Sequence, residues 1–371
     1  MTVNRAVPFF NYQRLYSDDR DAFLKIFDEV GHRGAFIMQK DVTEFEQYLA
    51  SYTGARFAIG VGNATDGLEF AWMSLGLRPG DEVICSSHTM LATAASIKTA
   101  GGIPVPVELG LDGLIDPDAV ADAINPRTVG IMPTQLNGRT CDMDQIMALA
   151  SRHNLFVVED AAQALGSKFN SKHAGTFGNV SAISFFPAKV LGCLGDGGGV
   201  ITDDPAIHDK IFQMHDHGRD QSGEVRSWGR NSRLDNLQAA LLNYKFKTYE
   251  SVIERRREIA NLYQFHLGDL NEINLPPSPD SDPRHFDVFQ NYEIQADKRD
   301  ELKSYLSGQG IGTLIQWGGK AVHQWERLGF LCRLPKVEKF FTRCIMLPMN
   351  MFLSNDDVEY VCQKIRSFYR S

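Results

Sequence analysis

A lysine stands just beyond an apolar run that predicts a buried strand. The run is Val180–Phe186, Pro187 follows it, and Lys189 comes two residues later. Proline cannot donate to a β-ladder, so we expect the chain to turn there and leave Lys189 at the strand end. The amine of such a lysine can form a Schiff base with a carbonyl compound, and the glycines of 195–199 let the backbone pass close to it. For Lys189 taken alone, the simpler interpretation is a solvated lysine in a glycine-rich turn.

Polar residues follow several other predicted strands. They are Thr65 with the amides of Asp66 and Gly67, His88, Asp160, Gln163 and Ser184. A carboxylate at Asp160 can pair with the nitrogen of a pyridine ring and make that ring an electron sink. The hydroxyls and helix-start amides of the set can hold a phosphate. His88 can stack on the ring, Gln163 can hydrogen-bond a ring hydroxyl, and Lys189 can move a proton between carbon atoms. Each residue also has a plainer explanation as a cap or turn residue, so the hypothesis depends on their convergence.

The elements that position these residues alternate along the chain. Apolar strands are predicted at 56–61, 83–87, 103–108, 129–134, 155–158 and 180–186, and helices at 18–30, 41–52, 68–75, 91–99, 116–124 and 143–153. Asp116 and Pro117 are typical of the cap and first position of one such helix. Continuous apolar strands between helices indicate an α/β fold with a mostly parallel sheet buried on both faces. Ligands of such sheets bind at the carboxyl ends of the strands.

A smaller α+β domain is predicted at the C-terminal end. The pattern is helical from 234 to 267, a proline-rich connection spans 271–284, and strands are predicted at 289–295 and 312–317. Helices are expected at 298–306 and 355–369. We therefore predict a large domain over residues 1–250 and a small C-terminal domain over 251–371.

Composition narrows the classes of function. The chain has 371 residues and a net charge of −8, which favours neither nucleic acid nor an anionic membrane as partner. No apolar run reaches transmembrane length, and residues 1–21 lack the apolar core of a signal peptide. Six cysteines form no C-x-x-C pair, so no metal site or disulfide framework is indicated. Reduced thiols in the cytoplasm are the simplest account.

Several short motifs resemble the DegT/DnrJ/EryC1/StrS family of sugar aminotransferases, which depend on pyridoxal 5′-phosphate. The central ones are VEDAAQA at 158–164, SFFPAKVLG at 184–192 and GDGG at 195–198. Others are PGDEVI at 79–84, DMD at 142–144, HGR at 217–219, NSRLDNLQAA at 231–240 and GIGT at 310–313. The resemblance implies the aspartate-aminotransferase (type I) fold.

The resemblance also implies roles for single residues. Lys189 matches the Schiff-base lysine, and Asp160 and Gln163 match the contacts to the ring nitrogen and ring hydroxyl. Thr65, Ser184 and the adjoining amides match the phosphate site. Asn231 matches a residue that reaches the cofactor of the neighbouring subunit, which implies a homodimer with shared active sites.

The substrate implied by the resemblance is a nucleotide-linked keto-sugar, with glutamate as the amino donor. The chain departs from the common pattern at His88, where a large aromatic residue is frequent. It departs again at Gln316, Trp317 and Lys320, which we expect to face the sugar.

Two alternatives remain open. One branch of the family replaces the lysine with histidine and dehydrates a sugar, and Lys189 argues against that branch. A regulator that binds the cofactor without turnover is the other alternative, although neither terminus carries a basic nucleic-acid-binding segment.

Overall fold

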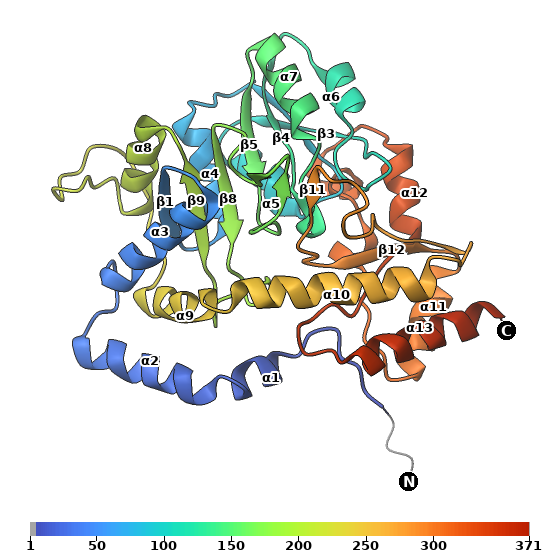
Figure 1. Cartoon of the computed structure of the whole chain (residues 1–371). Helices are drawn as coiled ribbons and strands as arrows, with labels where there is room; N and C mark the ends of the chain where they lie inside the picture. The colour runs from blue at the N-terminus through green and yellow to red at the C-terminus, as the bar shows by residue number, and fades with distance from the viewer. Residues whose placement is uncertain (1–4, 371) are drawn as a thin grey trace.

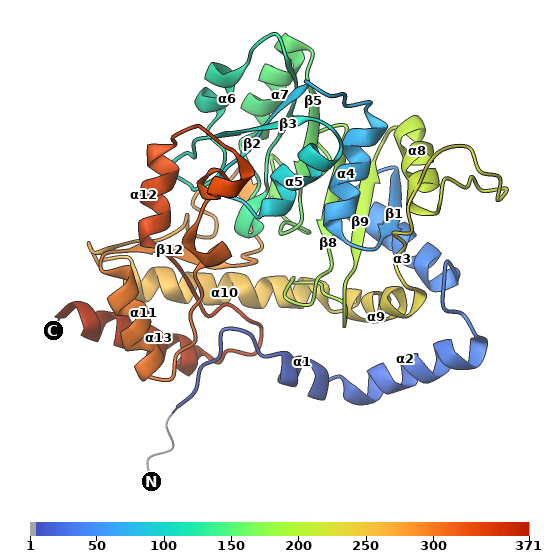
Figure 2. The same ribbon diagram turned by 180° about the vertical axis from the view of Figure 1, so that it is seen from behind.

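The computed structural model describes residues 5–370. Residues 1–4 and 371 lie outside the described residues. They include the outer ends of the two predicted domains and the start of the N-terminal segment 1–21. Figures 1 and 2 show a large sheet with helices on its faces, and a long helix, α10 (Tyr249–Leu267), that runs below it towards a smaller second part. Within residues 5–370, no helix is long and apolar enough to cross a membrane.

The large sheet has seven strands in the order β1-β9-β8-β5-β4-β2-β3. They are β1 (Phe57–Val61), β2 (Glu82–Ser86), β3 (Ile103–Val107), β4 (Thr128–Met132), β5 (Phe156–Asp160), β8 (Val180–Ser184) and β9 (Gly198–Thr202). Strand β9 is antiparallel to both of its neighbours, and the remaining neighbouring pairs are parallel. The mostly parallel sheet of the predicted α/β fold is thus confirmed.

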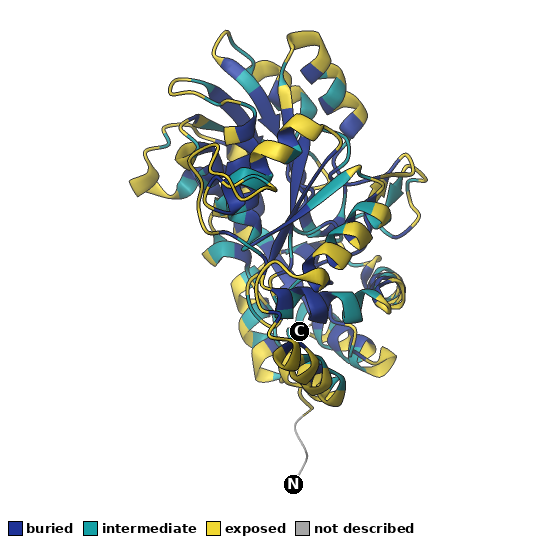
Figure 3. Ribbon diagram, turned by 90° about the vertical axis from the view of Figure 1, so that its left-hand side faces the viewer, coloured by how far each residue is buried: buried dark blue, intermediate teal, exposed yellow. Residues whose placement is uncertain are grey.

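Apolar cores and helices cover both faces of the large sheet. Successive side chains of each strand point to opposite faces and so enter different cores. Val83 packs into one apolar core and Ile84 into another, and Val158 and Val157 divide in the same way. The first face is covered by α4 (Ala64–Ser74), α5 (Leu91–Thr99) and α8 (Pro205–His215). The second face is covered by α3 (Lys40–Thr53), α6 (Pro117–Ala123), α7 (Met143–His153) and α9 (Asn236–Phe246). In Figure 3 the strands are accordingly buried and the outer helix faces exposed.

Local signals explain where helices begin. Asp116 caps α6 by accepting a hydrogen bond from the Asp118 amide, with Pro117 at the first helical position, as predicted.

Two N-terminal helices, α1 (Tyr12–Ser17) and α2 (Arg20–Arg33), run along the base of the molecule (Figure 1). The Phe23 ring of α2 meets the Tyr244 ring of α9 edge-on.

The smaller part is built on a three-stranded antiparallel sheet in the order β10-β12-β13. Its elements are β10 (Ile273–Asn274), β12 (Tyr292–Ala296), α11 (Arg299–Gly308), α12 (Pro335–Arg343), β13 (Cys344–Leu347) and α13 (Asn355–Arg370). A third small sheet joins β6 (Lys168–Phe169), β7 (Lys172–His173) and β11 (His285–Phe286). Val7 packs into the core of the smaller part, although it belongs to the predicted large domain. The domain boundary at residue 250 stays a prediction.

Several predicted elements differ from the structure. The strand expected at 312–317 is wrong, because only Leu314 forms an isolated bridge and the 3-10 turn η2 (Gln316–Gly319) follows. Positive φ angles of 48°, 67° and 76° at 317–319 are incompatible with a strand. The single helical pattern at 234–267 divides into α9 and α10. Strands β9 and β13 and helix α12 were not predicted. Glycines masked β9, and β13 is a run of only four residues. Helix α12 did carry a signal that was missed, with Pro335 at its first position and Val337, Phe340 and Phe341 on one buried face.

Candidate active site

A cavity of about 370 Å³ opens at the carboxyl ends of β5 and β8. Six residues predicted from the sequence line it together: Thr65, Asp160, Gln163, Ser184, Lys189 and Trp317. They come from segments far apart in the chain, and the parallel sheet brings them to one edge. The cavity size is in the range that holds a small organic cofactor.

Lys189 lies in the turn that follows β8. Its backbone amide donates to the carbonyl of Phe186 over 2.8 Å, so the chain reverses directly after Pro187. Burial lowers the pKa of the Lys189 amine to about 8, and the nearby Asp160 carboxylate partly opposes that shift. About a tenth of the amine is therefore neutral and nucleophilic at pH 7, far more than for an exposed lysine.

Asp160 ends β5, and a chain of hydroxyl groups holds its carboxylate. Its Oδ2 accepts a hydrogen bond of 2.7 Å from Thr93 Oγ1, and its Oδ1 accepts one of 3.2 Å from the Ala162 amide. Thr134 Oγ1 donates to Thr89 Oγ1 over 3.0 Å, so the Thr89 hydroxyl donates in turn to Thr93, 2.7 Å away. Burial raises the pKa of Asp160, while the Thr93 and Ala162 hydrogen bonds act to lower it. The chain thus favours the charged carboxylate in a buried place.

The start of α4 forms another wall, but not with the predicted amides. Asn63 caps the helix, its Oδ1 accepts the Asp66 amide over 2.9 Å, and its carbonyl accepts the Gly67 amide over 3.2 Å. The use of the Asp66 and Gly67 amides for a phosphate is therefore corrected. The amides of Ala64 and Thr65 precede them, have no acceptor within the helix, and belong to residues that line the cavity.

Glycines let β9 approach the start of α4. A Cβ atom built on Gly198 would lie 2.5 Å from the carbonyl carbon of Asn63, and one on Gly67 would lie 2.9 Å from Val200 Cγ2. Such distances exclude a larger side chain at either position without a shift of the backbone or strand. Gly67 therefore serves the packing of α4 on the sheet, and Gly198 alone of the glycine run meets the start of α4 from the other side.

Gln163 has a fixed orientation. Its Oε1 accepts hydrogen bonds from the Asn137 amide at 3.0 Å and from Asn291 Nδ2 at 3.2 Å. Because both neighbours are donors, the remaining Nε2 of Gln163 is the group free to donate towards the cavity. This orientation of the amide fits the predicted hydrogen bond from Gln163 to the hydroxyl group on the cofactor ring.

His88 does not line the cavity, so its prediction as a ring-stacking residue is wrong. The chain bends after β2 ends, and His88 is buried with Nδ1 2.8 Å from the Gly113 carbonyl and Nε2 3.2 Å from Glu293 Oε2. Its ring packs on Phe340, with the ring centroids 4.5 Å apart. Met90, two residues further on, lines the cavity instead.

Of the three residues predicted to face the sugar, the structure places only Trp317 in the cavity wall. Gln316 is buried, and its Nε2 donates to Asn137 Oδ1 over 3.0 Å. Lys320 is exposed, with its amine 5.2 Å from the centre of the Trp325 ring. Asn231 is also exposed and does not line the cavity of its own chain.

Three residues of the site were missed from the sequence. Met90 and Thr93 carry no motif, and Thr93 reaches Asp160 only because α5 packs on β2, β3 and α4 in the folded chain. Asn137 has a left-handed φ of 56°, and the Asn-Gly pair that it forms with Gly138 was a usable signal for such a turn. Within residues 5–370, no group of His, Cys, Asp or Glu side chains is arranged to hold a metal ion.

The residues present fit pyridoxal phosphate by their chemistry. Lys189 provides an amine for its aldehyde, and Asp160 provides a buried carboxylate for its ring nitrogen. Thr65, Ser184 and the unpaired amides at the start of α4 provide donors for its phosphate.

Known proteins support this interpretation. The model of the DegT/DnrJ/EryC1/StrS aminotransferase family matches residues 17–366. A pleiotropic regulatory protein of Geobacillus stearothermophilus is 38% identical over 98% of this chain and 99% of its own length. The dTDP-3-amino-3,4,6-trideoxy-α-D-glucose transaminase of Streptomyces venezuelae is 34% identical over 98% of this chain and 96% of its own. The crystal structure of S. venezuelae DesV with a ketimine intermediate has a TM-score of 0.94 at 34% identity, with 99% of each chain covered.

Proposed function

Because this chain belongs to the DegT/DnrJ/EryC1/StrS aminotransferase family, whose cofactor is pyridoxal phosphate, we propose that it aminates the ketone of a nucleotide-linked sugar. The observation that carries the proposal is the shared cavity of Lys189 and Asp160, which also holds Thr65, Gln163 and Ser184. An amine of lowered pKa beside a buried carboxylate is the pair that transamination requires.

Pyridoxal phosphate, when bound, supplies an aldehyde that exchanges amino groups and a ring that withdraws electrons from the reacting carbon. Lys189 Nζ would supply the neutral amine that holds the aldehyde. The same amine, when free, would carry a proton between two carbon atoms. Its pKa of about 8 suits both tasks near neutral pH.

The other residues of the cavity would bind the charged and polar groups of the cofactor. Asp160 would pair with the ring nitrogen and keep it protonated, while the Thr93 hydrogen bond favours the charged form of Asp160. Gln163 Nε2 would donate to the oxygen of the ring hydroxyl. Thr65 and the amides that open α4 would bind the phosphate, which a helix N-terminus favours electrostatically.

The proposed substrate has its ketone at carbon 3 of the sugar, and the proposed donor is glutamate. The S. venezuelae transaminase supports carbon 3, since it is named for a 3-amino sugar. Trp317 lines the cavity, which supports the proposal that it contacts the sugar.

We further propose that the active protein is a homodimer with shared sites. Asn231 is exposed in the single chain, in a position open to a second copy. Two large apolar side chains that line the cavity, Met90 and Phe186, are also exposed, and a partner would cover them.

A non-catalytic regulator is the second candidate, because the relative from G. stearothermophilus is named as a regulatory protein. The reactive lysine favours catalysis, since regulation alone does not require an amine of lowered pKa. A sugar dehydratase is the third possibility, and it differs in whether nitrogen enters the product.

The test uses purified protein, pyridoxal phosphate, [¹⁵N]glutamate and dTDP-linked 3-keto and 4-keto sugars. We expect ¹⁵N in the sugar product from the 3-keto substrate, and none with the Lys189→Ala variant. Protein that remains colourless with pyridoxal phosphate, or that forms an unlabelled dehydrated product, would refute the proposal. Turnover of the 4-keto sugar alone would refute the assignment of carbon 3.

A further inference from the structure

One side chain from outside the large sheet forms hydrogen bonds with the backbone on both sides of Lys189. Gln290, which precedes β12, donates from Nε2 to the carbonyl of Ala188 over 2.8 Å. Its Oε1 accepts the amide of Val190, also over 2.8 Å. Gln290 is 5% exposed, so these hydrogen bonds are shielded from water. The two bonded groups lie immediately before and after Lys189 in the chain.

These contacts fix both backbone rotations of Lys189. The Ala188 carbonyl belongs to the peptide plane that precedes the lysine Cα, and the Val190 amide belongs to the plane that follows it. The first plane is held a second time, since the Lys189 amide donates to Phe186 over 2.8 Å. With both planes held, φ and ψ of Lys189 cannot change unless Gln290 moves.

Gln290 is itself anchored. Arg256 of α10 is buried, and its Nη1 donates to the carbonyls of Phe289 and Gln290, each over 3.0 Å, and to that of Met349 over 2.9 Å. The guanidinium therefore holds the backbone of Gln290.

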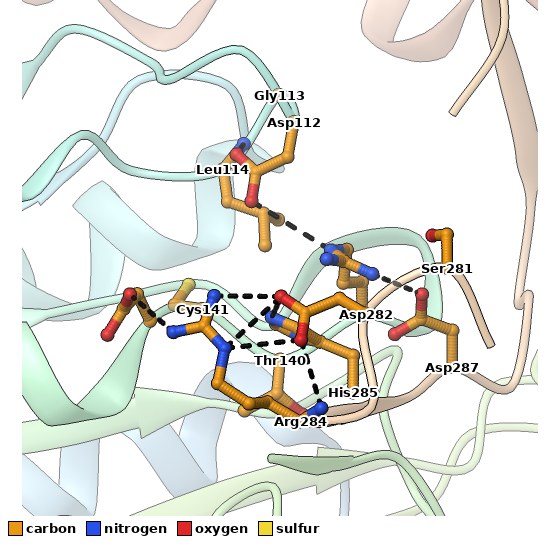
Figure 4. A network of polar contacts seen from close by, with 12 residues as sticks. Asp112, Gly113, Leu114, Thr140, Cys141, Ser281, Asp282, Arg284, His285 and Asp287 are labelled. Carbon is orange, nitrogen blue, oxygen red and sulfur yellow. Dashed lines mark hydrogen bonds and ion pairs between the residues drawn. The ribbon is translucent and has the colours of Figure 1, made fainter. Parts of the chain in front are cut away.

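The segment before Gln290 is also bound to the large-domain loop at 137–139. The Val288 amide donates to the Gly138 carbonyl over 2.9 Å. Arg139 lies between two carboxylates labelled in Figure 4, with Nη1 2.5 Å from Asp287 Oδ2 and Nε 3.8 Å from Asp112 Oδ2. Contacts on both sides thus give Gln290 a defined position before any ligand binds.

We propose that Gln290 is a positioning residue that holds the Lys189 backbone so that its amine meets the cofactor aldehyde at the correct angle. It acts through the peptide groups on either side of the lysine and touches neither cofactor nor substrate. The proposal rests on the proposed role of Lys189. It also means that a shift of the smaller part relative to the sheet changes the placement of the amine.

The test separates cofactor binding from covalent capture in cofactor-free full-length protein. Pyridoxal phosphate is added, and the Lys189 adduct trapped by borohydride is counted by mass spectrometry at successive times. Binding of 4′-deoxypyridoxine 5′-phosphate, which lacks the aldehyde, is measured by calorimetry. Gln290→Met keeps the size of the side chain and removes both hydrogen bonds. Gln264→Ala is the matched control, because Gln264 also donates to a backbone carbonyl, that of Pro276, away from the cavity.

We expect Gln290→Met to capture pyridoxal phosphate about tenfold more slowly, since small misplacements of a reacting group are costly. Its affinity for the deoxy analogue should stay within about twofold of the wild type, as should both properties of Gln264→Ala. Gln290→Glu adds a readout that a packing role would not produce. A protonated carboxyl both donates and accepts, so its capture rate relative to wild type should recover as pH falls through the carboxyl pKa.

Equal capture rates for wild type and Gln290→Met would overturn the inference, as would a parallel loss of affinity for the deoxy analogue. A Gln290→Glu deficit that ignores pH would also count against it. Wild-type protein that captures no pyridoxal phosphate would instead refute the proposed function. If Gln290→Met fails to fold, judged by circular dichroism, the Gln290→Glu pH series decides.

Discussion

The hydroxyl of Thr93 donates a 2.7 Å hydrogen bond to the buried carboxylate of Asp160. It ends a relay from Thr134 and Thr89 in which every hydroxyl donates in the same direction. Chains of this kind polarise one another and stabilise the charge at their end.

Thr93→Val should therefore raise the Asp160 pKa further. A hydrogen bond to a charged group is worth about 1.5–3 kcal/mol, and we expect that loss in the free energy of unfolding at neutral pH. The loss should shrink at acidic pH, where Asp160 is protonated and gains less from the donor. Denaturant unfolding at several pH values measures it, with Thr93→Ser as the control that keeps the hydroxyl. A loss independent of pH would show that packing, not charge, is at stake.

The reactivity of Lys189 should depend on pH with a midpoint near its pKa of about 8. Burial favours the neutral amine, and the Asp160 carboxylate favours the charged one. Asp160→Asn should thus move the midpoint to lower pH. Reductive methylation of cofactor-free protein, followed at the Lys189 peptide by mass spectrometry, measures the midpoint, and the peptide of exposed Lys25 is the internal reference. An upward movement in Asp160→Asn would contradict the electrostatic account.

Met90, rather than His88, should affect cofactor affinity. A methionine sulfur against an aromatic ring contributes about 0.3–1.5 kcal/mol, so Met90→Ala should weaken pyridoxal phosphate binding by about two- to tenfold. His88→Gln should change that affinity by less than about twofold, because its ring faces Gly113 and Glu293. Equilibrium dialysis compares the variants. A larger effect at His88 would restore the stacking role.

A shared site predicts complementation between two inactive variants. Lys189→Ala lacks the amine, and Asn231→Ala lacks the residue proposed to reach the partner's cofactor. Mixed and refolded together, they should form hybrid dimers in which one site has both wild-type residues. Transaminase activity of the mixture should exceed that of either variant alone. Activity no higher than the separate variants, with hybrids present by native mass spectrometry, would exclude the contribution of Asn231 across the interface.

Much of the fold was predictable because apolar strands and capped helices carry local signals. Asp116 and Pro117 opened α6 as expected, and strand ends placed Lys189 and Asp160 in one cavity. The family match over residues 17–366 and the likeness to DesV confirm the predicted family and fold.

Several of the errors depend on contacts between distant segments, whereas the strand expected at 312–317 failed for the local reason of positive φ angles. His88 follows a strand, as the residues that line the cavity do, but the chain bends after the strand and the His88 ring lies against Glu293 instead of in the cavity. Gly198 looked like loop sequence, yet its missing side chain is what lets β9 pass Asn63. Gln290 and Thr93 act only through partners that no local pattern identifies.

Helix α10 has a consequence for how the chain unfolds. Its first turns place Tyr249 and Ile253 in the core with Phe45, while Ile259 and Tyr263 further along belong to the core of the smaller part. Melting of either core must unwind a helix that the other core needs. The two parts are therefore coupled in a single cooperative transition, so calorimetry should show one heat-absorption peak for the whole chain.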